Sequence, residues 1–295
     1  MNSIKYKLKL AALAAALVVL MPSAQAQKAY PSPAAAADAL VDGIARRDGE
    51  ALKTTLGPSY RQYIPTDDID ADDAVDFLAA WAKSHQIVEV SDKKALLEAG
   101  TRGWTLPIPI VRTTAGWRFD LKAGAEEMRT RRIGRNELAV MQVLLAYTDA
   151  QEEYARVDRN GDGVKEFASR FLSTPGRHDG LYWKTAPGEA ESPIGRLVAE
   201  AKPGQPFYGY LYRMLPAQGK DAPGGAKSYR RNGHMTEGYA LVAWPARYGD
   251  TGVMSFMVSR AGVVYEKDLG PRGEATAKAM TSFNPDSSWK KVDVK

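Results

Sequence analysis

The sequence contains no cysteine and only three histidines among its 295 residues. The absence of cysteine excludes disulfide bonds, so an exported chain of this composition relies on its hydrophobic core for stability. It also excludes a lipid anchor attached to a cysteine behind a leader segment. Three histidines are too few for a histidine-rich metal site.

Common catalytic signatures are absent as well. The chain has no G-x-S-x-G nucleophile elbow, no H-E-x-x-H zinc motif, no P-loop and no dinucleotide fingerprint. Asp250-Thr251-Gly252 matches the tripeptide of aspartic proteases, but it occurs once, and such an enzyme needs a second aspartate from another lobe or subunit. A tight turn between two predicted strands explains the tripeptide, so we reject the protease interpretation.

Long apolar runs are confined to the N-terminus. Residues 10–20 form an apolar run that is too short to cross a bilayer, which needs about 20 such residues. Three lysines precede this run, and the small-residue motif Ala24-Gln25-Ala26 follows it, as in a secretory signal peptide. We therefore predict that residues 1–26 are a signal peptide and that the mature protein is periplasmic or secreted. An uncleaved N-terminal anchor is the less favoured alternative. No later stretch predicts a membrane helix.

The charge balance gives no sign of a nucleic-acid partner. The chain has 40 basic and 35 acidic residues, a formal net charge of +5. Three of the lysines lie in the predicted signal peptide, and their removal leaves 37 basic residues against 35 acidic ones, a net charge of +2. Nucleic-acid binding would require a clustered basic face instead, so we predict that no nucleic acid is bound.

Residues 27–121 are predicted to form a small α+β domain. Ser32 and Pro33 are typical of a helix start, as N-cap and first helical residue. The predicted helices span 34–47, 52–56 and 72–84, and the predicted strands span 87–90, 104–112 and 117–121, the last two joined by a turn at 113–116. Two prolines within 104–112 cannot donate to a ladder, which indicates an edge strand or an irregular one.

Residues 122–295 are predicted to form a larger domain in which a long helix packs on an antiparallel sheet. The helix spans about 123–156 with an interruption at Gly134, and its wide apolar face should be buried. We expect Leu138, Met141, Leu145, Val253 and Phe256 among the most buried residues. The predicted strands span 207–214, 238–244, 253–259 and 263–267, and further helices span 192–201 and 274–283. The fold class is therefore α+β.

Tyrosines alternate at the start of the first strand of this sheet. Tyr208, Tyr210 and Tyr212 should share one strand face if the strand is regular. Such a face can be a platform for a carbohydrate or a peptide, but a half-buried face under a helix is the commoner arrangement. We favour packing.

An acidic loop is the strongest candidate site. Asp158, Asn160 and Asp162 place oxygen ligands at alternate positions, Gly163 follows where a calcium loop turns sharply, and Glu166 falls at the ninth position. An EF-hand has a bidentate Glu at the twelfth position, where this chain has Ser169. The loop therefore predicts a weak site for a hard divalent cation, calcium first. A polar turn without a metal is the competing interpretation.

Two histidines in glycine-bearing loops are candidates for a general base. His178 is followed by Asp179, and His234 precedes Glu237, so each has a carboxylate nearby in sequence that could orient it. Solvated loop histidines without a role are more common. These residues define the enzymatic alternative, an uncharacterised periplasmic hydrolase that uses His178 or His234.

Several long strings resemble one bacterial family. IGRNELAVMQVLLAYTDAQEEYA, FLSTPGRHDGLYW, ALVAWPARYGDTGVMSFMV and GVVYEKDLG look like the secreted family known as domain of unknown function 2950 (DUF2950). The resemblance covers nearly all of the mature chain, and it implies a periplasmic or secreted location and little about chemistry. More loosely, the second half is similar in architecture to the globular part of pseudopilins, although a prepilin leader is missing.

These observations favour an exported envelope protein that is not an enzyme. The best-supported role is a binding or accessory module that contacts an unknown envelope protein or polymer through the loops and sheet of its second half. Fold similarity alone does not define a function.

Overall fold

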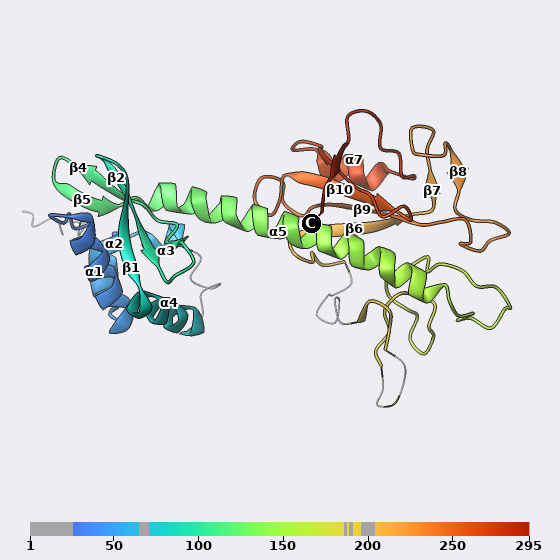
Figure 1. Ribbon diagram of the computed structural model, residues 1–295, viewed down its shortest axis with the longest axis horizontal. Coiled ribbons are helices and arrows are strands. Elements are labelled where there is room, and N and C mark those ends of the chain that lie inside the picture. Colours follow the sequence, from blue (N-terminus) through green and yellow to red (C-terminus); the bar gives the residue numbers. More distant parts are fainter. Residues whose placement is uncertain (1–25, 65–70, 186–187, 189–190, 196–203, 295) are drawn as a thin grey trace, which may run out of the picture. The chain divides into compact units, whose positions relative to one another are not determined.

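The computed structural model describes residues 26–64, 71–185, 188, 191–195 and 204–294, and the chain divides into two compact units, Met1–Ala125 and Glu126–Lys295. Each contains helices and antiparallel strands, so the predicted α+β class is confirmed (Figure 1). The predicted signal peptide lies outside the described residues, except for Ala26. Within the described part of the chain, no helix has both the length and the apolar character needed to cross a membrane.

The helices of the first unit begin where the sequence places their caps. Ser32 accepts a hydrogen bond from Ala35 N at 3.1 Å, and Asp48 accepts bonds from Glu50 N and Ala51 N at 3.0 Å. The helices are α1 (Pro33–Ala45), α2 (Gly49–Leu56), α3 (Tyr60–Tyr63) and α4 (Ala71–Lys83).

The sheet of the first unit has five strands in the order β1-β2-β4-β5, with β3 paired to β2. Its strands are β1 (His85–Ser91), β2 (Lys94–Ala99), β3 (Trp104–Thr105), β4 (Ile110–Thr113) and β5 (Gly116–Phe119). The sequence does not predict β2, because its residues KALLEA are mostly good helix formers. The single strand expected at 104–112 is two strands, since Pro107 and Pro109 lack the N–H that a continuous ladder needs. Leu97, Ile110 and Phe119 from this sheet are buried in one core.

The second unit contains most of α5 (Leu121–Tyr154) and a five-stranded antiparallel sheet in the order β12-β11-β10-β9-β6. The strands are β6 (Tyr210–Leu215), β9 (Ala240–Pro245), β10 (Met254–Ser259), β11 (Val264–Asp268) and β12 (Lys290–Val292), and β7 (Ala217–Gln218) pairs with β8 (Lys227–Ser228). The sequence predicted four of these strands but not β7, β8 or β12. The expected helix at 192–201 lies largely outside the described residues.

Helix α5 is continuous, so the predicted interruption at Gly134 is wrong. A glycine inside a helix costs only about 1 kcal/mol relative to alanine, which the rest of a long helix can offset. Buried positions of this helix include Val140, Val143, Leu144 and Tyr147, which follow the i, i+3, i+4, i+7 spacing of one helix face, and the burial continues to Tyr154.

The predicted burial is therefore only partly right. Phe256 is 1% exposed, as expected, and Met141, Leu145 and Val253 are partly buried. Leu138, in contrast, is 63% exposed, and its predicted burial is wrong. Residues 138 and 147 are nine positions apart, which places them about half a turn apart around a helix with 3.6 residues per turn, so Leu138 lies on the face opposite Tyr147.

The sheet is covered on both faces. On β6, Tyr210 reaches α5 through Glu137, whereas Arg213 donates to the carbonyl of Ala277 in α7 (Gly273–Ala279) at 2.8 Å. Because residues 210 and 213 point to opposite faces of a strand, α5 and α7 lie on opposite sides of the sheet, as Figure 1 shows. All six residues of β9 are buried between these layers.

The expected tyrosine ladder does not form. Strand β6 begins at Tyr210, so Tyr208 lies outside it, with a φ of 48° and 47% of its surface exposed. Tyr210 is fully buried, and burial raises the pKa of its hydroxyl well above the ordinary value. Tyr210 and Tyr212 therefore serve packing, as favoured from the sequence. A tight turn at Ala261-Gly262 joins β10 to β11.

Candidate metal centre

The acidic loop follows directly on the C-terminal end of α5. Its far end is fixed because Phe167 and Ala168 enter the core of the second unit. The fully buried side chain of Gln151, on α5, donates to Ala168 O at 2.9 Å and accepts from Ala168 N at 2.8 Å. Both ends of the loop are thus tied to the same helix, which restricts the conformations of the ligands between them.

Asp158 shapes the loop from within. One carboxylate oxygen accepts bonds from Gly161 N at 2.8 Å and Asn160 N at 3.3 Å, and the other accepts from Gly163 N at 2.8 Å. These backbone hydrogen bonds, led by that from Gly163, lower the pKa of Asp158 below its ordinary value. Gly161 and Gly163 have φ values of 77° and 85°, which residues with a side chain rarely adopt.

The side chains of the other three predicted ligands meet, but the oxygen of Asn160 accepts a bond from Asp162 N at 3.2 Å, and it is the amide nitrogen that faces the carboxylates. The amide nitrogen of Asn160 donates to Asp162 Oδ2 at 2.8 Å and to Glu166 Oε1 at 3.1 Å. Both carboxylates therefore bind the same amide group, whose nitrogen offers one N–H to each. A cation at the same place would interact with both carboxylates more strongly than a neutral amide does.

His234 completes the cluster from a distant part of the chain. Its Nδ1 lies 3.6 Å from Asp162 Oδ2 and 3.5 Å from Glu166 Oε2. One ligand atom from each of these three residues lies within 4.8 Å of the other two. We name Asp162, Glu166 and His234 the DEH cluster. The sequence did not associate the histidine with the loop, since nothing in the local pattern of either segment indicates their contact.

The turn that carries His234 is docked on the loop by backbone contacts. Arg231 and His234 exchange two backbone hydrogen bonds, of 2.9 and 3.0 Å. The next residue, Met235, donates its N–H to Glu166 Oε2 at 3.0 Å and accepts from Phe167 N at 2.8 Å. The relative position of the imidazole and the carboxylates is therefore set by main-chain bonds as well as by side chains.

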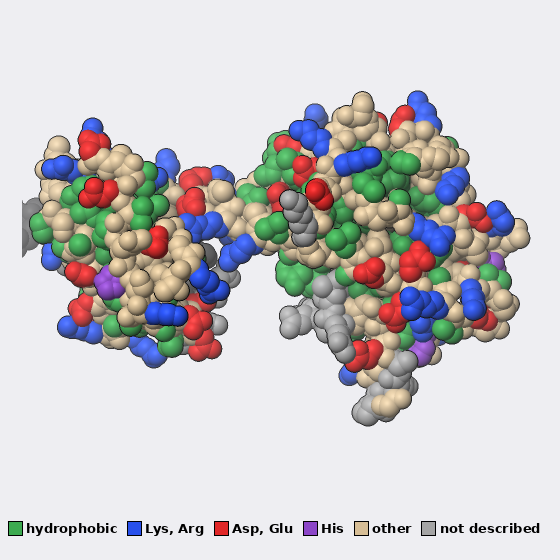
Figure 2. Space-filling model, viewed as in Figure 1, with side chains coloured by type: hydrophobic (Ala, Val, Ile, Leu, Met, Phe, Trp, Pro, Cys, Tyr) green, Lys and Arg blue, Asp and Glu red, His purple; other side chains and the backbone are tan. Residues whose placement is uncertain are grey.

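The cluster is accessible to solvent. The side chains of Asp162, Glu166 and His234 are 36%, 23% and 31% exposed. Figure 2 shows histidine side chains at the surface of the second unit, among acidic and basic ones. An ion can therefore reach the DEH cluster without a conformational change.

His178 lies in a different environment. Its ring is exposed and stacks on Trp183 with centroids 4.3 Å apart, and its backbone carbonyl accepts a bond from the Tyr154 hydroxyl at 2.9 Å. The neighbouring Asp179 is bonded to Thr174 N at 2.7 Å and to Thr174 Oγ1 at 2.8 Å. Partial burial works to raise the pKa of Asp179, but the bonds from Thr174 outweigh it and lower that pKa.

The carboxylates expected to orient the two histidines are therefore engaged elsewhere. Asp179 anchors its own loop through Thr174, and Glu237 forms an ion pair with Arg231 at 2.9 Å. His234 instead faces Asp162 and Glu166. The arrangement around His234 is one of potential ligands, while His178 makes a ring stack on an aromatic side chain.

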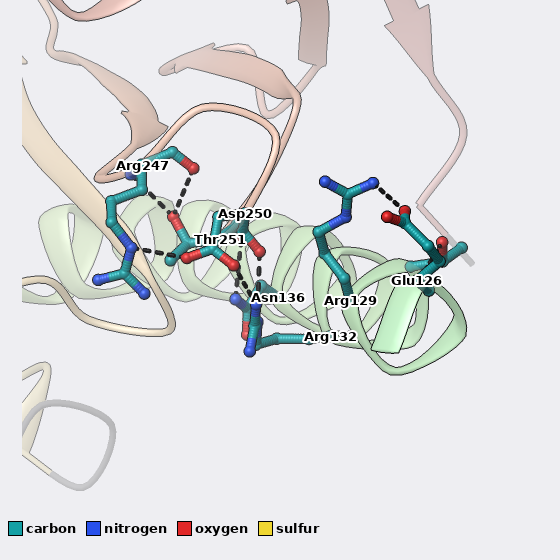
Figure 3. Close-up of polar contacts among 8 residues, drawn as sticks. Glu126, Arg129, Arg132, Asn136, Arg247, Asp250 and Thr251 are labelled. Atoms are coloured by element: carbon teal, nitrogen blue, oxygen red, sulfur yellow. Dashed lines mark hydrogen bonds and ion pairs between the residues drawn. The ribbon is translucent and has the colours of Figure 1, made fainter. Parts of the chain in front are cut away.

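The aspartic-protease tripeptide is a structural turn that docks on α5 (Figure 3). Asp250 forms ion pairs with Arg132 and with Arg247, the latter at 2.6 Å. Asn136 donates to Thr251 O at 2.8 Å. The polar groups of Asp250 and Thr251 shown in the figure thus bind structural partners, which agrees with the rejection of a protease site.

The fold and the cluster together define an α+β protein with a surface cluster of carboxylate and imidazole ligands. The chain belongs to the family described as protein of unknown function (DUF2950), whose model matches residues 27–292. No curated protein and no solved structure matches the chain. The similarity in architecture to pseudopilins therefore stays a prediction.

Proposed function

We propose that this chain is an exported, non-enzymatic envelope protein that binds a divalent cation at the loop spanning Asp158 to Glu166. The loop would serve a binding or accessory module, with an envelope protein or polymer as the partner. The charge and small-residue pattern of residues 1–26 supports export. The cation site is supported by the geometry of the loop.

One observation carries the proposal. Asp162 and Glu166 converge on one amide nitrogen at the solvent surface, and neither carboxylate has an ion pair with Lys or Arg among the described contacts. Together with Asp158 they concentrate three carboxylates in nine residues. Oxygen ligands of this kind suit calcium, and in an extracellular compartment a site with a dissociation constant of about 0.1–1 mM would be occupied.

A bound cation should stabilise the second unit by mass action. It would offset the mutual repulsion of the carboxylates in the folded state, and the unfolded chain has no such site. At a free concentration of 10 to 100 times the dissociation constant, the gain is about 1.4–2.7 kcal/mol. For a unit of this size, that raises the unfolding midpoint by about 3–10 °C.

The test is thermal unfolding of the mature protein in chelator and in each divalent cation at several millimolar. We expect the midpoint of the wild type to rise with the cation and that of Asp162→Ala to stay unchanged. Glu153→Ala removes an exposed carboxylate of α5 and is the matched control, which should behave like the wild type. If none of the divalent cations shifts the unfolding midpoint of the wild type, the cation site is wrong and the loop is a polar turn.

Export and cleavage of the signal peptide are tested by a separate measurement. Mass spectrometry of protein recovered from the periplasm or the medium should give an N-terminus at Gln27. Protein retained in the inner membrane with Met1 intact would contradict cleavage.

The alternative function, a hydrolase that uses His178 or His234, has one observation in its favour, the two carboxylates that face His234. An activity on ester, phosphoester or peptide substrates that His234→Ala abolishes and His178→Ala leaves intact would support it. The engagement of Asp179 and Glu237 with other partners is the reason that we favour binding.

A further inference from the structure

We infer that the cation site takes zinc in preference to calcium, and that the DEH cluster supplies its three protein ligands. This inference rests on the proposed function, because it assumes that the loop holds a divalent cation at all. It adds a ligand, His234, that the loop sequence does not contain, and it changes the class of ion.

The loop lacks the carboxylate with which a calcium loop completes its shell. Calcium takes six to eight oxygen ligands, and a calcium loop obtains two of them from a bidentate carboxylate at its twelfth position. Here the chain leaves the loop directly after Glu166, because Phe167 and Ala168 are buried and Gln151 holds Ala168 by two hydrogen bonds. The residue at the twelfth position, Ser169, is exposed and has no carboxylate.

His234 provides a nitrogen ligand in its place. Imidazole suits zinc and other transition metals, whereas calcium and magnesium prefer oxygen. Zinc forms bonds of about 2.0–2.1 Å in tetrahedral geometry, which places neighbouring ligand atoms about 3.3–3.4 Å apart. The observed separations of His234 Nδ1 from Asp162 Oδ2 and Glu166 Oε2, 3.6 and 3.5 Å, differ from that spacing by only a few tenths of an ångström.

The hydrogen bonds around the DEH cluster favour three protein ligands rather than the five candidates that the loop and His234 offer together. Both oxygens of Asp158 accept backbone N–H groups, so this residue shapes the loop. Met235 N donates to Glu166 Oε2, and Asn160 donates to the remaining oxygen, Oε1. Hydrogen bonds of this kind orient metal-binding carboxylates in other proteins. Three protein ligands leave the fourth tetrahedral position of zinc to water or to a group of a binding partner.

The experiment is isothermal titration calorimetry of the tag-free, metal-free mature protein with zinc chloride and, separately, with calcium chloride. Three proteins are compared: the wild type, His234→Ala and His178→Ala. His178 is an exposed histidine outside the DEH cluster, so its variant controls for zinc bound to any surface imidazole. Because His234 lies in a surface turn, circular dichroism should confirm that both variants keep the wild-type spectrum, and His234→Gln serves as a second variant.

We expect one zinc per chain, bound more tightly than calcium. His234→Ala and His234→Gln should weaken zinc binding at least tenfold, while His178→Ala leaves it unchanged. If calcium binds more tightly than zinc, or if the His234 variants bind zinc as the wild type does, the inference is wrong and cation binding by the loop still stands. If neither ion binds, both the inference and the proposed cation site are wrong.

Discussion

Replacing Leu144 by alanine should test which face of α5 supports the second unit. Leu144 is fully buried between the helix and the sheet, whereas Leu138, six residues earlier on the same helix, is 63% exposed. Removing a buried leucine side chain costs its transfer free energy and leaves a cavity, together about 2.7–5 kcal/mol. The same substitution at Leu138 removes little buried surface and should stay within about 0.5 kcal/mol of the wild type. Because both changes convert leucine to alanine within one helix, they share nearly the same effect on helix propensity.

Urea unfolding followed by circular dichroism and tryptophan fluorescence is the assay. Trp183, Trp244 and Trp289 all lie in the second unit and are buried, so their fluorescence reports its unfolding. In thermal unfolding, Leu144→Ala should lower the midpoint by about 6–20 °C and Leu138→Ala should leave it nearly unchanged. Equal losses in the two variants, or a loss below about 1 kcal/mol for Leu144→Ala, would refute the assignment of the buried face.

Two further substitutions test the turn at 249–252. Gly252→Ala would place a methyl group onto the hydroxyl of the buried Tyr210, and we expect a loss of about 1–3 kcal/mol in urea unfolding, whereas Gly134→Ala, in open space on α5, should be neutral or stabilising by up to about 1 kcal/mol. For Asp250, partial burial works to raise the pKa, but Arg247 and Arg132 outweigh it and hold the pKa below its ordinary value. The carboxylate therefore stabilises the fold above the unfolded pKa of about 3.9, and that contribution is lost as the pH falls through the lower folded value. Asp250→Asn should accordingly be less stable than the wild type at pH 7, with a difference that shrinks below about pH 4, and a difference independent of pH would contradict the ion pairs.

Local signals in the sequence predicted much of the fold. Ser32 and Pro33 start α1 because a side-chain cap and a fixed φ act within one turn of helix, independently of the rest of the chain. Gly262 lies in the turn between β10 and β11 with a φ of 70°, a conformation that favours glycine. Strands β6, β9, β10 and β11 follow from runs of Val, Tyr and Phe between turn residues, and β9 is buried on both faces.

Where the apolar pattern was wide, the sequence could not choose among alternatives. The leucine, valine and tyrosine side chains of α5 itself are spread around much of its circumference. The helical period was therefore compatible with a buried Leu138. In the structure the buried face of α5 is that of Val140, Val143 and Leu144, because this face packs against β9 and β10. Similarly, β2 is a strand only because it pairs with β1 and β4, against the helical preference of its residues.

The candidate site, like the fold, was predicted only in part from the sequence. The sequence by itself determined the acidic loop, since the alternation of Asp158, Asn160 and Asp162 and the glycines that let the loop turn are all local. Only the tertiary structure brought His234 to Asp162 and Glu166, because that contact depends on the backbone bonds between Met235 and the segment 166–167. Contacts between residues so distant in the chain depend on how the turn that carries His234 docks on the core. No local sequence pattern predicts them. A loop whose sequence predicted oxygen ligands alone thereby has an imidazole nitrogen beside its carboxylates.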